Sequence, residues 1–195
     1  MQRKLCSDSG ALSVDPSGGI IIKLVAKTAC HSYQPVQVAA ICYRIRRASI
    51  EFLLVNTSSG KWTFPKGRMD PKLSASEAAA REALEEAGVM GRIGSSHFDS
   101  YLDTKRIFGE GHQSCEICIG AYLLEVERTA DPEEADRNPT WFSPDEAKER
   151  LSERRLPKYS YDLARIVDRA TRVVTRQKAD DRFAYRSQRR VTMFQ

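Results

Sequence analysis

The sequence of 195 residues lacks any long hydrophobic run. Its longest apolar stretch near the start, Ile20 to Ala26, is interrupted by Lys23 and is far shorter than the roughly 20 apolar residues of a membrane-spanning helix. No apolar segment typical of a secretory signal peptide follows Arg3 and Lys4. We therefore expect a protein without membrane spans and, as the default, a cytoplasmic location.

Cysteine is scarce as well. The chain has five cysteines, an odd number, and their scatter along the sequence argues against a disulfide framework. Cys115 and Cys118 form a C-x-x-C pair, but they fall in a strand-like run and no second ligand pair completes a zinc site. We interpret both as ordinary strand residues.

The remaining composition is typical of one folded domain with appendages. Hydrophobic residues make up 41% of the chain, enough for a core, and charged residues 29%. We expect a flexible N-terminal arm at 1–19, a single domain at 20–178 and a basic C-terminal tail at 179–195. Arginines without any acidic residue follow Asp181, so the tail could hold an anionic partner or be solvated.

An amphipathic helix is predicted between Ser74 and Gly88. Ser74 and Glu77 form the S-x-x-E capping box, and Gly88 is placed to end the helix in the left-handed conformation. At about 100° per residue, one side of this helix carries Ala80, Ala83, Leu84 and Ala87. The other side carries three carboxylates: Glu82, Glu85 and Glu86. Taken alone, this pattern would be explained by a solvated acidic surface.

The rest of the chain predicts a mixed α/β fold. Strands are expected at 19–27, 36–46, 50–55, 97–105, 114–127 and 140–142, with a loop at 109–112 and a turn at 91–94. Ser143 and Glu146 form a second capping box before a helix, and a last helix is expected to begin near Ser160. Strands with helices before and after them predict an α/β/α sandwich with a mixed central sheet.

The segment from Gly67 to Val89 resembles the box of the Nudix hydrolases, G-x5-E-x7-R-E-U-x-E-E-x-G-U, where U is aliphatic. Its second half reads REALEEAGV, and every fixed spacing is kept. Leu73 replaces the first Glu of the family pattern, and the small Ala83 occupies the first U. Leu73 removes a carboxylate near Arg81, and Glu77 is a candidate replacement, although the capping box competes for it.

The resemblance extends from about Val36 to Ala170 and implies the Nudix α/β/α sandwich and a metal-dependent hydrolase. The metal ligands that the resemblance implies are Glu85 and Glu86, with Glu82 as a further ligand or as the residue that orients the attacking water. Arg81 would orient these carboxylates. Like charges 4 Å apart repel by about 4 kcal/mol at an effective dielectric near 20, so a cation would relieve this cluster. Mg2+ is the expected ion, with Mn2+ as an alternative, because such hard cations prefer oxygen ligands.

The family often takes a catalytic base or a further ligand from outside the box. Glu116 is the preferred candidate because its strand face is lined mainly by small residues. Glu133 and Glu134 in an acidic loop are alternatives, although a solvated loop is the simpler interpretation of these two residues.

A phosphorylated small molecule is the expected substrate. Lys66, Gly67 and Arg68 are the candidate substrate-binding residues, since cations beside a metal site can receive further phosphates. Solvated loop charges would explain the same residues. Further basic candidates without a predicted position are Lys105, Arg106, Arg154 and Arg155.

Phe64 to Gly67 and Met69 to Pro71 resemble the dinucleoside polyphosphate and diphosphoinositol polyphosphate branches of the family. The implied activity is therefore pyrophosphohydrolysis of such a substrate. The alternative is a weak or inactive Nudix domain that binds a nucleotide or RNA as a sensor, with the basic tail touching nucleic acid. The complete set of box carboxylates favours the enzyme, whereas Leu73 favours the sensor.

Overall fold

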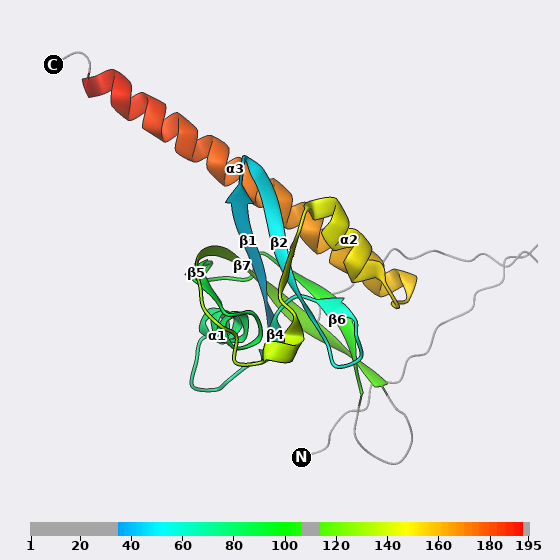
Figure 1. The fold of residues 1–195 in the computed structure, drawn as a ribbon. Coiled ribbons are helices and arrows are strands. Elements are labelled where there is room, and N and C mark those ends of the chain that lie inside the picture. The colour runs from blue at the N-terminus through cyan, green and yellow to red at the C-terminus, as the bar shows by residue number, and fades with distance from the viewer. Residues whose placement is uncertain (1–34, 107–113, 193–195) are drawn as a thin grey trace, which may run out of the picture.

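The fold is built on a mixed eight-stranded sheet (Figure 1). Its strands are β1 (Gln37–Arg46), β2 (Ser49–Asn56), β3 (Trp62–Thr63), β4 (Lys66–Arg68), β5 (Val89–Ile93), β6 (Asp99–Arg106), β7 (Ser114–Thr129) and β8 (Thr140–Phe142). The main path runs β3-β2-β1-β7-β5, with β4 added to β1, β6 to β7 and β8 to β2. Because β1 is parallel to β7 and antiparallel to β2, the sheet is mixed, as the sequence predicts.

This computed structural model describes the chain over residues 35–106 and 114–192. The expected arm at 1–19, the strand expected at 19–27 and the loop expected at 109–112 lie outside the described residues.

The strand β1 organises the two faces of the sheet. Ala39, Ile41 and Tyr43 belong to one buried apolar cluster, whereas the alternating Val38, Ala40 and Cys42 belong to the other. This period of two is the pattern of a strand covered on both faces. The turn to β2 has two residues with positive φ, Arg47 at 50° and Ala48 at 67°, which is typical of a tight hairpin.

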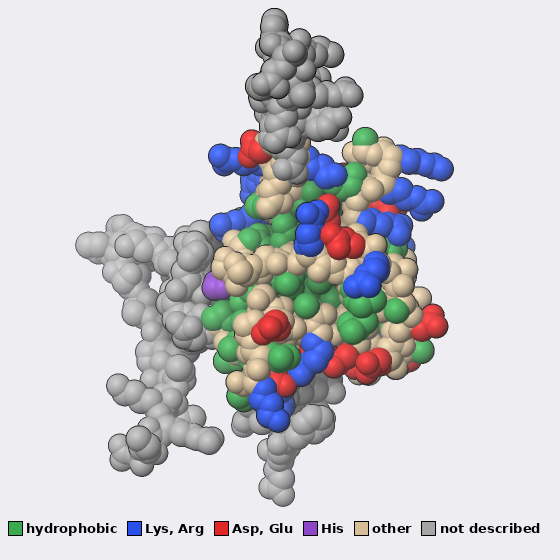
Figure 2. Space-filling model, turned by 90° about the vertical axis from the view of Figure 1, so that its left-hand side faces the viewer, with side chains coloured by type: hydrophobic (Ala, Val, Ile, Leu, Met, Phe, Trp, Pro, Cys, Tyr) green, Lys and Arg blue, Asp and Glu red, His purple; other side chains and the backbone are tan. Residues whose placement is uncertain are grey.

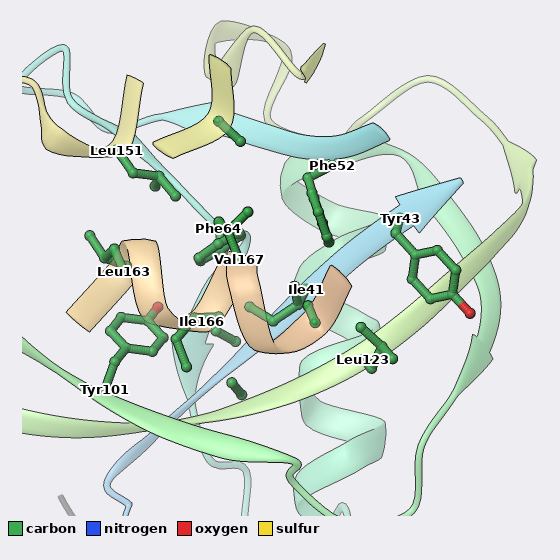
Figure 3. Packing of buried hydrophobic residues seen from close by; sticks show 14 of the residues in the cluster. Ile41, Tyr43, Phe52, Phe64, Tyr101, Leu123, Leu151, Leu163, Ile166 and Val167 are labelled. Carbon is green, nitrogen blue, oxygen red and sulfur yellow. The ribbon is translucent and has the colours of Figure 1, made fainter. Parts of the chain in front are cut away.

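Helices cover both faces of the sheet, which confirms the predicted α/β/α sandwich (Figure 1). The helix α1 (Ala75–Ala87) packs its alanines on one face, whereas α2 (Pro144–Ser152) and α3 (Pro157–Thr192) cover the other. Figure 3 shows side chains of α2 and α3 meeting those of β1, β2 and β6 in the larger core cluster. Full burial of each such large apolar side chain stabilises the fold by about 1.5–3 kcal/mol.

The helix α1 begins and ends as predicted. Ser74 caps its start, and Glu77 completes the capping box by accepting from the Ser74 amide. Gly88 has φ 62° and ψ 30°, the left-handed conformation that ends a helix. Ser143 and Glu146 form the second predicted capping box at the start of α2.

The prediction of a turn at 91–94 is wrong, since β5 occupies most of this segment. Its pairing with β7 is irregular between Met90 and Gly91. A β-carbon at Gly91 would overlap the carbonyl oxygen of Glu125, so this position of the strand requires glycine. Gly91, one of the two glycines that suggested a turn, therefore permits a bulged edge strand instead.

The helix α3 begins at Pro157, slightly earlier than predicted, and its 36 residues span roughly 54 Å. Val174 is the last of its residues in the buried cluster, and beyond it the helix extends past the sheet (Figure 1). The backbone is helical through most of the segment that the sequence predicts as a tail. In Figure 2, Lys and Arg side chains gather toward the part of the molecule where α3 lies.

Among the described residues, no helix combines the length and apolar content needed to cross a membrane. Cys42 is a free thiol in β1, and burial raises its pKa. Cys118 lies in the strand β7, as predicted, but it is disulfide-bonded, so the argument from sequence against disulfides is wrong for this residue.

We expect the first half of α3 to be an integral part of the domain. Ile166 is 0% exposed and lies in the larger core cluster (Figure 3). Ile166→Ala should lower the free energy of unfolding by about 2–5 kcal/mol, because it removes buried methylene groups and leaves a cavity. Leu156→Ala is the control: Leu156 is 64% exposed, and its loss should change stability by about 0.5 kcal/mol or less. Equal effects in urea unfolding would contradict this packing.

Candidate active site

The segment before α1 is held against this helix by the sheet. Gly67 of β4 pairs with Val38 of β1, and the Ala40 amide donates to the Pro65 carbonyl at 2.9 Å. A β-carbon at Gly67 would overlap the carboxylate of Glu82 on α1. Any other residue here would displace Glu82, so glycine lets the helix carboxylate approach the β4 backbone.

Glu86 is the most buried carboxylate of the box, with 3% of its surface exposed. One of its oxygens accepts from the Lys66 amide at 3.2 Å, and the other lies 2.7 Å from Nη2 of Arg137. Burial raises the pKa of Glu86 to about 7, although the Arg137 charge and the Lys66 amide both oppose this shift. The free energy cost of burying this charge is therefore only partly offset.

Glu82 and Glu85 complete the acidic face of α1. Burial raises the pKa of Glu82, and the neighbouring charge of Glu85 raises it further. Glu85 lies 3.5 Å from Nε of Arg81, one helical turn away. Within residues 35–106 and 114–192, no three acidic, histidine or cysteine side chains are arranged to hold a metal ion. Arg137 instead occupies the outer oxygen of Glu86.

Arg81 is anchored by a residue that the sequence argument missed. Its Nη1 lies 2.8 Å from Oδ2 of Asp70, and the Lys72 amide holds the other Asp70 oxygen at 2.9 Å. Glu77, the predicted replacement for the carboxylate missing at Leu73, instead accepts from the Ser74 amide and hydroxyl in the capping box. Asp70 therefore provides the carboxylate partner of Arg81.

Leu73 has a packing role in this arrangement. Its side chain is partly buried against the apolar cluster beneath α1, and its amide donates to the Asp70 carbonyl at 3.1 Å. This turn brings Asp70 toward Arg81. The chain thus lacks the carboxylate that the family pattern has at the position of Leu73, but it has a carboxylate three positions earlier, at Asp70.

Arg137 is a second residue that the sequence argument missed. It ends the short 3-10 helix η1 (Ala135–Arg137) and bonds Glu86 at 2.7 Å, Glu134 at 2.6 Å and the Asn56 carbonyl at 3.4 Å. The only sequence signal was an arginine three residues after Glu134. This spacing suggested neither the contact with Glu86 nor the one with Asn56.

The acidic loop approaches the box through Glu134. The Glu134 amide donates to the Glu85 carbonyl at 3.0 Å, and its charge contributes to the raised pKa of Glu82. Glu116, the candidate preferred from sequence, instead bonds Tyr159 at 2.8 Å and Lys158 at 2.5 Å on α3. These partners lower the pKa of Glu116. The structure thus joins Glu134 to the box and Glu116 to α3.

The three candidate substrate-binding residues lie together on β4. Lys66 donates its amide to Glu86, and its Nζ lies 3.7 Å from Asp103 of β6. Gly67 contacts Glu82, whereas Arg68 is exposed at the end of the strand. Lys66 and Gly67 are therefore built into the carboxylate site, and Arg68 is at its surface.

The structure is consistent with the family that a sequence comparison identifies: it has the carboxylates of α1, the glycine at Gly67 beside them and the α/β/α sandwich. A model of the NUDIX domain matches residues 35–163, two thirds of the chain. The chain belongs to the NUDIX domain family. The matched range agrees with the extent of the resemblance predicted from sequence.

Individual relatives share parts of the chain. Nudix hydrolase 16, mitochondrial, of Arabidopsis thaliana is 35% identical over 105 residues, 51% of this chain and 57% of that protein. Diphosphoinositol polyphosphate phosphohydrolase 3-beta of Bos taurus is 38% identical over 73 residues, 35% of this chain and 44% of that protein. The chain thus spans about half the length of these relatives.

The cytoplasmic location that we expect from the sequence stays a prediction.

Two solved structures have the same fold. An Ap4A hydrolase of C. elegans in a binary complex gives a TM-score of 0.50 at 20% identity, covering 71% of this chain and 96% of that one. The NUDIX domain of Shewanella oneidensis NrtR, complexed with ADP ribose, gives 0.51 at 17% identity, covering 73% and 89%. Both support the fold assignment.

The buried Glu86 carboxyl should make the stability of the metal-free protein depend on pH. Its pKa rises from the ordinary 4.5 to about 7 on folding, so the folded state binds more protons between these values. The free energy of unfolding should therefore fall as pH rises from about 4.5 to 7, by about 3 kcal/mol in total. Urea unfolding in the presence of EDTA at several pH values measures this slope.

Two variants isolate the contribution of Glu86 to this slope. Glu86→Gln cannot ionise, so its stability should depend much less on pH across the same window. Glu149→Gln removes an exposed carboxyl on α2 and should keep the slope of the unchanged protein. A slope that survives Glu86→Gln would show that another group causes it.

Proposed function

We propose that this chain is a divalent-metal-dependent hydrolase that cleaves a diphosphate linkage in a phosphorylated small molecule. The observation that carries this proposal is the close approach of two box carboxylates, Glu82 and Glu86 of α1, to the β4 backbone at Gly67 and Lys66. Two of them, Glu82 and Glu86, have raised pKa values because they are buried near like charge. Such a cluster binds a cation readily, since the cation relieves the same repulsion that favours a proton.

The donor set fits Mg2+ or Mn2+, because every candidate ligand is a carboxylate oxygen. Glu82, Glu85 and Glu86 would hold the ion, which neutralises phosphate charge and lowers the pKa of a bound water. Asp70 fixes Arg81, and Arg81 fixes Glu85. Arg137 would exchange its bond with Glu86 for another partner as the ion binds.

We assign the carboxylate outside the box to Glu134. Its backbone is hydrogen-bonded to Glu85, and its charge acts on Glu82, so it lies near the cluster. Its present partner is Arg137 at 2.6 Å. An exchange of Arg137 away from Glu86 would also leave Glu134 free to orient or deprotonate the attacking water. The contacts of Glu116 with α3 do not favour it for this task.

The substrate that we propose is a diphosphoinositol polyphosphate or a dinucleoside polyphosphate. The sequence between Phe64 and Pro71 resembles these branches, and the bovine relative carries the first of these substrates in its name. Lys66 supports this choice, because it adds a cationic side chain to β4. The backbone of this strand approaches Glu86 at Lys66 and Glu82 at Gly67. A sensor without catalysis is less favoured, since Asp70 replaces the carboxylate that Leu73 removes.

Glu86→Gln should lower turnover by about two orders of magnitude or more, because it removes a charged ligand from the cluster. Phosphate release with Mg2+ is measured on dinucleoside polyphosphates, inositol pyrophosphates, ADP-ribose and capped RNA. Glu149→Gln, on the surface of α2, should retain the activity of the unchanged protein. Near-normal turnover by Glu86→Gln would disprove the assignment. Tight binding of one compound without turnover by the unchanged protein would favour the sensor.

The role of Asp70 can be tested by moving its carboxylate to the family position. Asp70→Ala should lower kcat by about 10- to 100-fold, since Arg81 loses the partner that orients it. Adding Leu73→Glu should restore a large part of this loss, whereas adding Leu73→Gln should not. Equal activities of the two double variants would show that a charge at this position does not act through Arg81.

A further inference from the structure

The outer part of α3, residues 172–192, concentrates the positive charge of the chain. This basic segment has seven lysines and arginines and two aspartates in its sequence, which is a formal charge of +5. The whole chain also has a formal charge of +5, so acidic and basic residues balance over the remainder. The net charge of the protein is therefore that of one helical segment.

The core-facing side of α3 is fixed by the residues that pack beneath it. Ile166, Ala170 and Val174 are buried in the larger core cluster. Arg172 and Arg176 stand two residues before and two after Val174, so both lie roughly 160° from it around the helix axis. Both of these arginines are exposed. These cations therefore lie on the side of α3 that faces away from the sheet.

The sequence continues this line of cations along the helix. Positions 186 and 190 carry arginines and follow positions 172 and 176 by 14 residues, which is close to four full turns. The four positions thus lie on one side of the helix axis. Val174 is the last residue of α3 in the core cluster, and the helix then projects past the sheet for roughly 27 Å (Figure 1).

The described cations of the basic segment have no carboxylate partner. Arg169, less than one turn before the segment, pairs with Asp99 at 3.1 Å. Arg172, Arg176 and Lys178 form no ion pair within residues 35–106 and 114–180. Like charges four residues apart, such as those of Arg172 and Arg176, destabilise a helix. A polar helix is ordinarily stabilised by opposite charges at that spacing, so an anionic partner would supply what this segment lacks.

Beyond Val174, the sequence does not continue the apolar side of α3. Gln177, Asp181 and Gln188 stand three, seven and 14 residues after Val174, so polar residues follow on the side that is buried over the sheet. A helix that lies on a membrane or pairs in a coiled coil needs a continuous apolar stripe. Nucleic acid does not require one, because charge and hydrogen bonds bind its phosphates.

We propose that the basic segment of α3 is a docking surface for nucleic acid, which it binds through the phosphate groups. Six of its seven cations are arginines, and the planar guanidinium group donates paired hydrogen bonds to phosphate. Position 183, seven residues after Arg176, lies on the same side of the axis and carries a phenylalanine, on which a base can stack. Binding of this kind does not depend on base sequence.

This surface is separate from the carboxylate site. Gly67 of that site pairs with Val38, near the start of β1. Tyr43, five residues further along β1, borders the same surface hollow as Gln177 and Lys178 of α3. Because each strand residue advances the chain by about 3.3 Å, roughly 16 Å of β1 separates the two places. The docking surface therefore does not rest on the proposed function.

Fluorescence anisotropy of the full chain in EDTA tests this proposal with a short single-stranded RNA and a short DNA duplex, each of arbitrary sequence. At least one of them should bind with a Kd of about 1–100 μM at physiological salt. Combining Arg176→Gln, Arg186→Gln and Arg190→Gln should weaken this binding at least tenfold. The slope of log affinity against log salt should become shallower by about two to three, since three phosphate contacts are lost. Absence of binding to both nucleic acids would overturn the proposal.

A matched variant removes the same charge from other exposed positions. It combines Lys72→Gln, Arg128→Gln and Arg154→Gln, and it should weaken binding by less than about threefold. Equal losses in the two triple variants would overturn the proposal, because net charge alone would then cause binding. Binding to phosphatidylserine vesicles without binding to nucleic acid would also overturn it.

A double variant keeps the test independent of any effect on folding. Arg172→Gln with Arg176→Gln changes only exposed side chains of the described helix, so the melting temperature should not fall. Affinity for the nucleic acid should still fall by about fivefold or more, with a shallower salt dependence. Unchanged affinity in this variant would show that the line of cations on α3 is not the docking surface.

Discussion

Close approach of like-charged carboxylates to the backbone of β4 is the constraint on which the rest of this structure depends. Glu82 and Glu86 can occupy this space because Gly67 has no side chain and because the alanine face of α1 lies against the sheet. Burial there raises the pKa of both groups. The same packing that stabilises the sandwich therefore buries carboxylates whose ionised form is unfavourable there.

The charges around this cluster come from different parts of the chain and have different tasks. Arg81 belongs to α1 itself and is fixed by Asp70 from the preceding loop. Arg137 comes from η1 and joins Glu86 to Glu134. Under the proposed function, the Arg137 side chain would move away from Glu86 when a metal ion binds, whereas the Lys66 amide would stay in place. The cluster thus combines fixed and exchangeable partners.

The helical layers on the two faces of the sheet contribute different charged groups. The layer of α1 carries the carboxylates, while Arg155 lies in the turn between α2 and α3 of the opposite layer. Lys66, on the sheet between them, contacts Glu86 on one side and Asp103 on the other. Residues at helix ends and loops can change without disturbing a buried sheet, so specificity in this arrangement can vary while the cluster is retained.

The sequence by itself determined the long strands, the helices and the identity of the acidic face, but not β5. Capping boxes, apolar periodicity and the spacing of Glu82, Glu85 and Glu86 are local patterns, and local patterns can be read along the chain. Only the tertiary structure decided which charged partners these residues have. Arg81 pairs with Asp70 rather than with Glu77, and Glu86 pairs with Arg137. The physical reason is that a salt bridge depends on where loops pass in space, and sequence spacing does not specify that path.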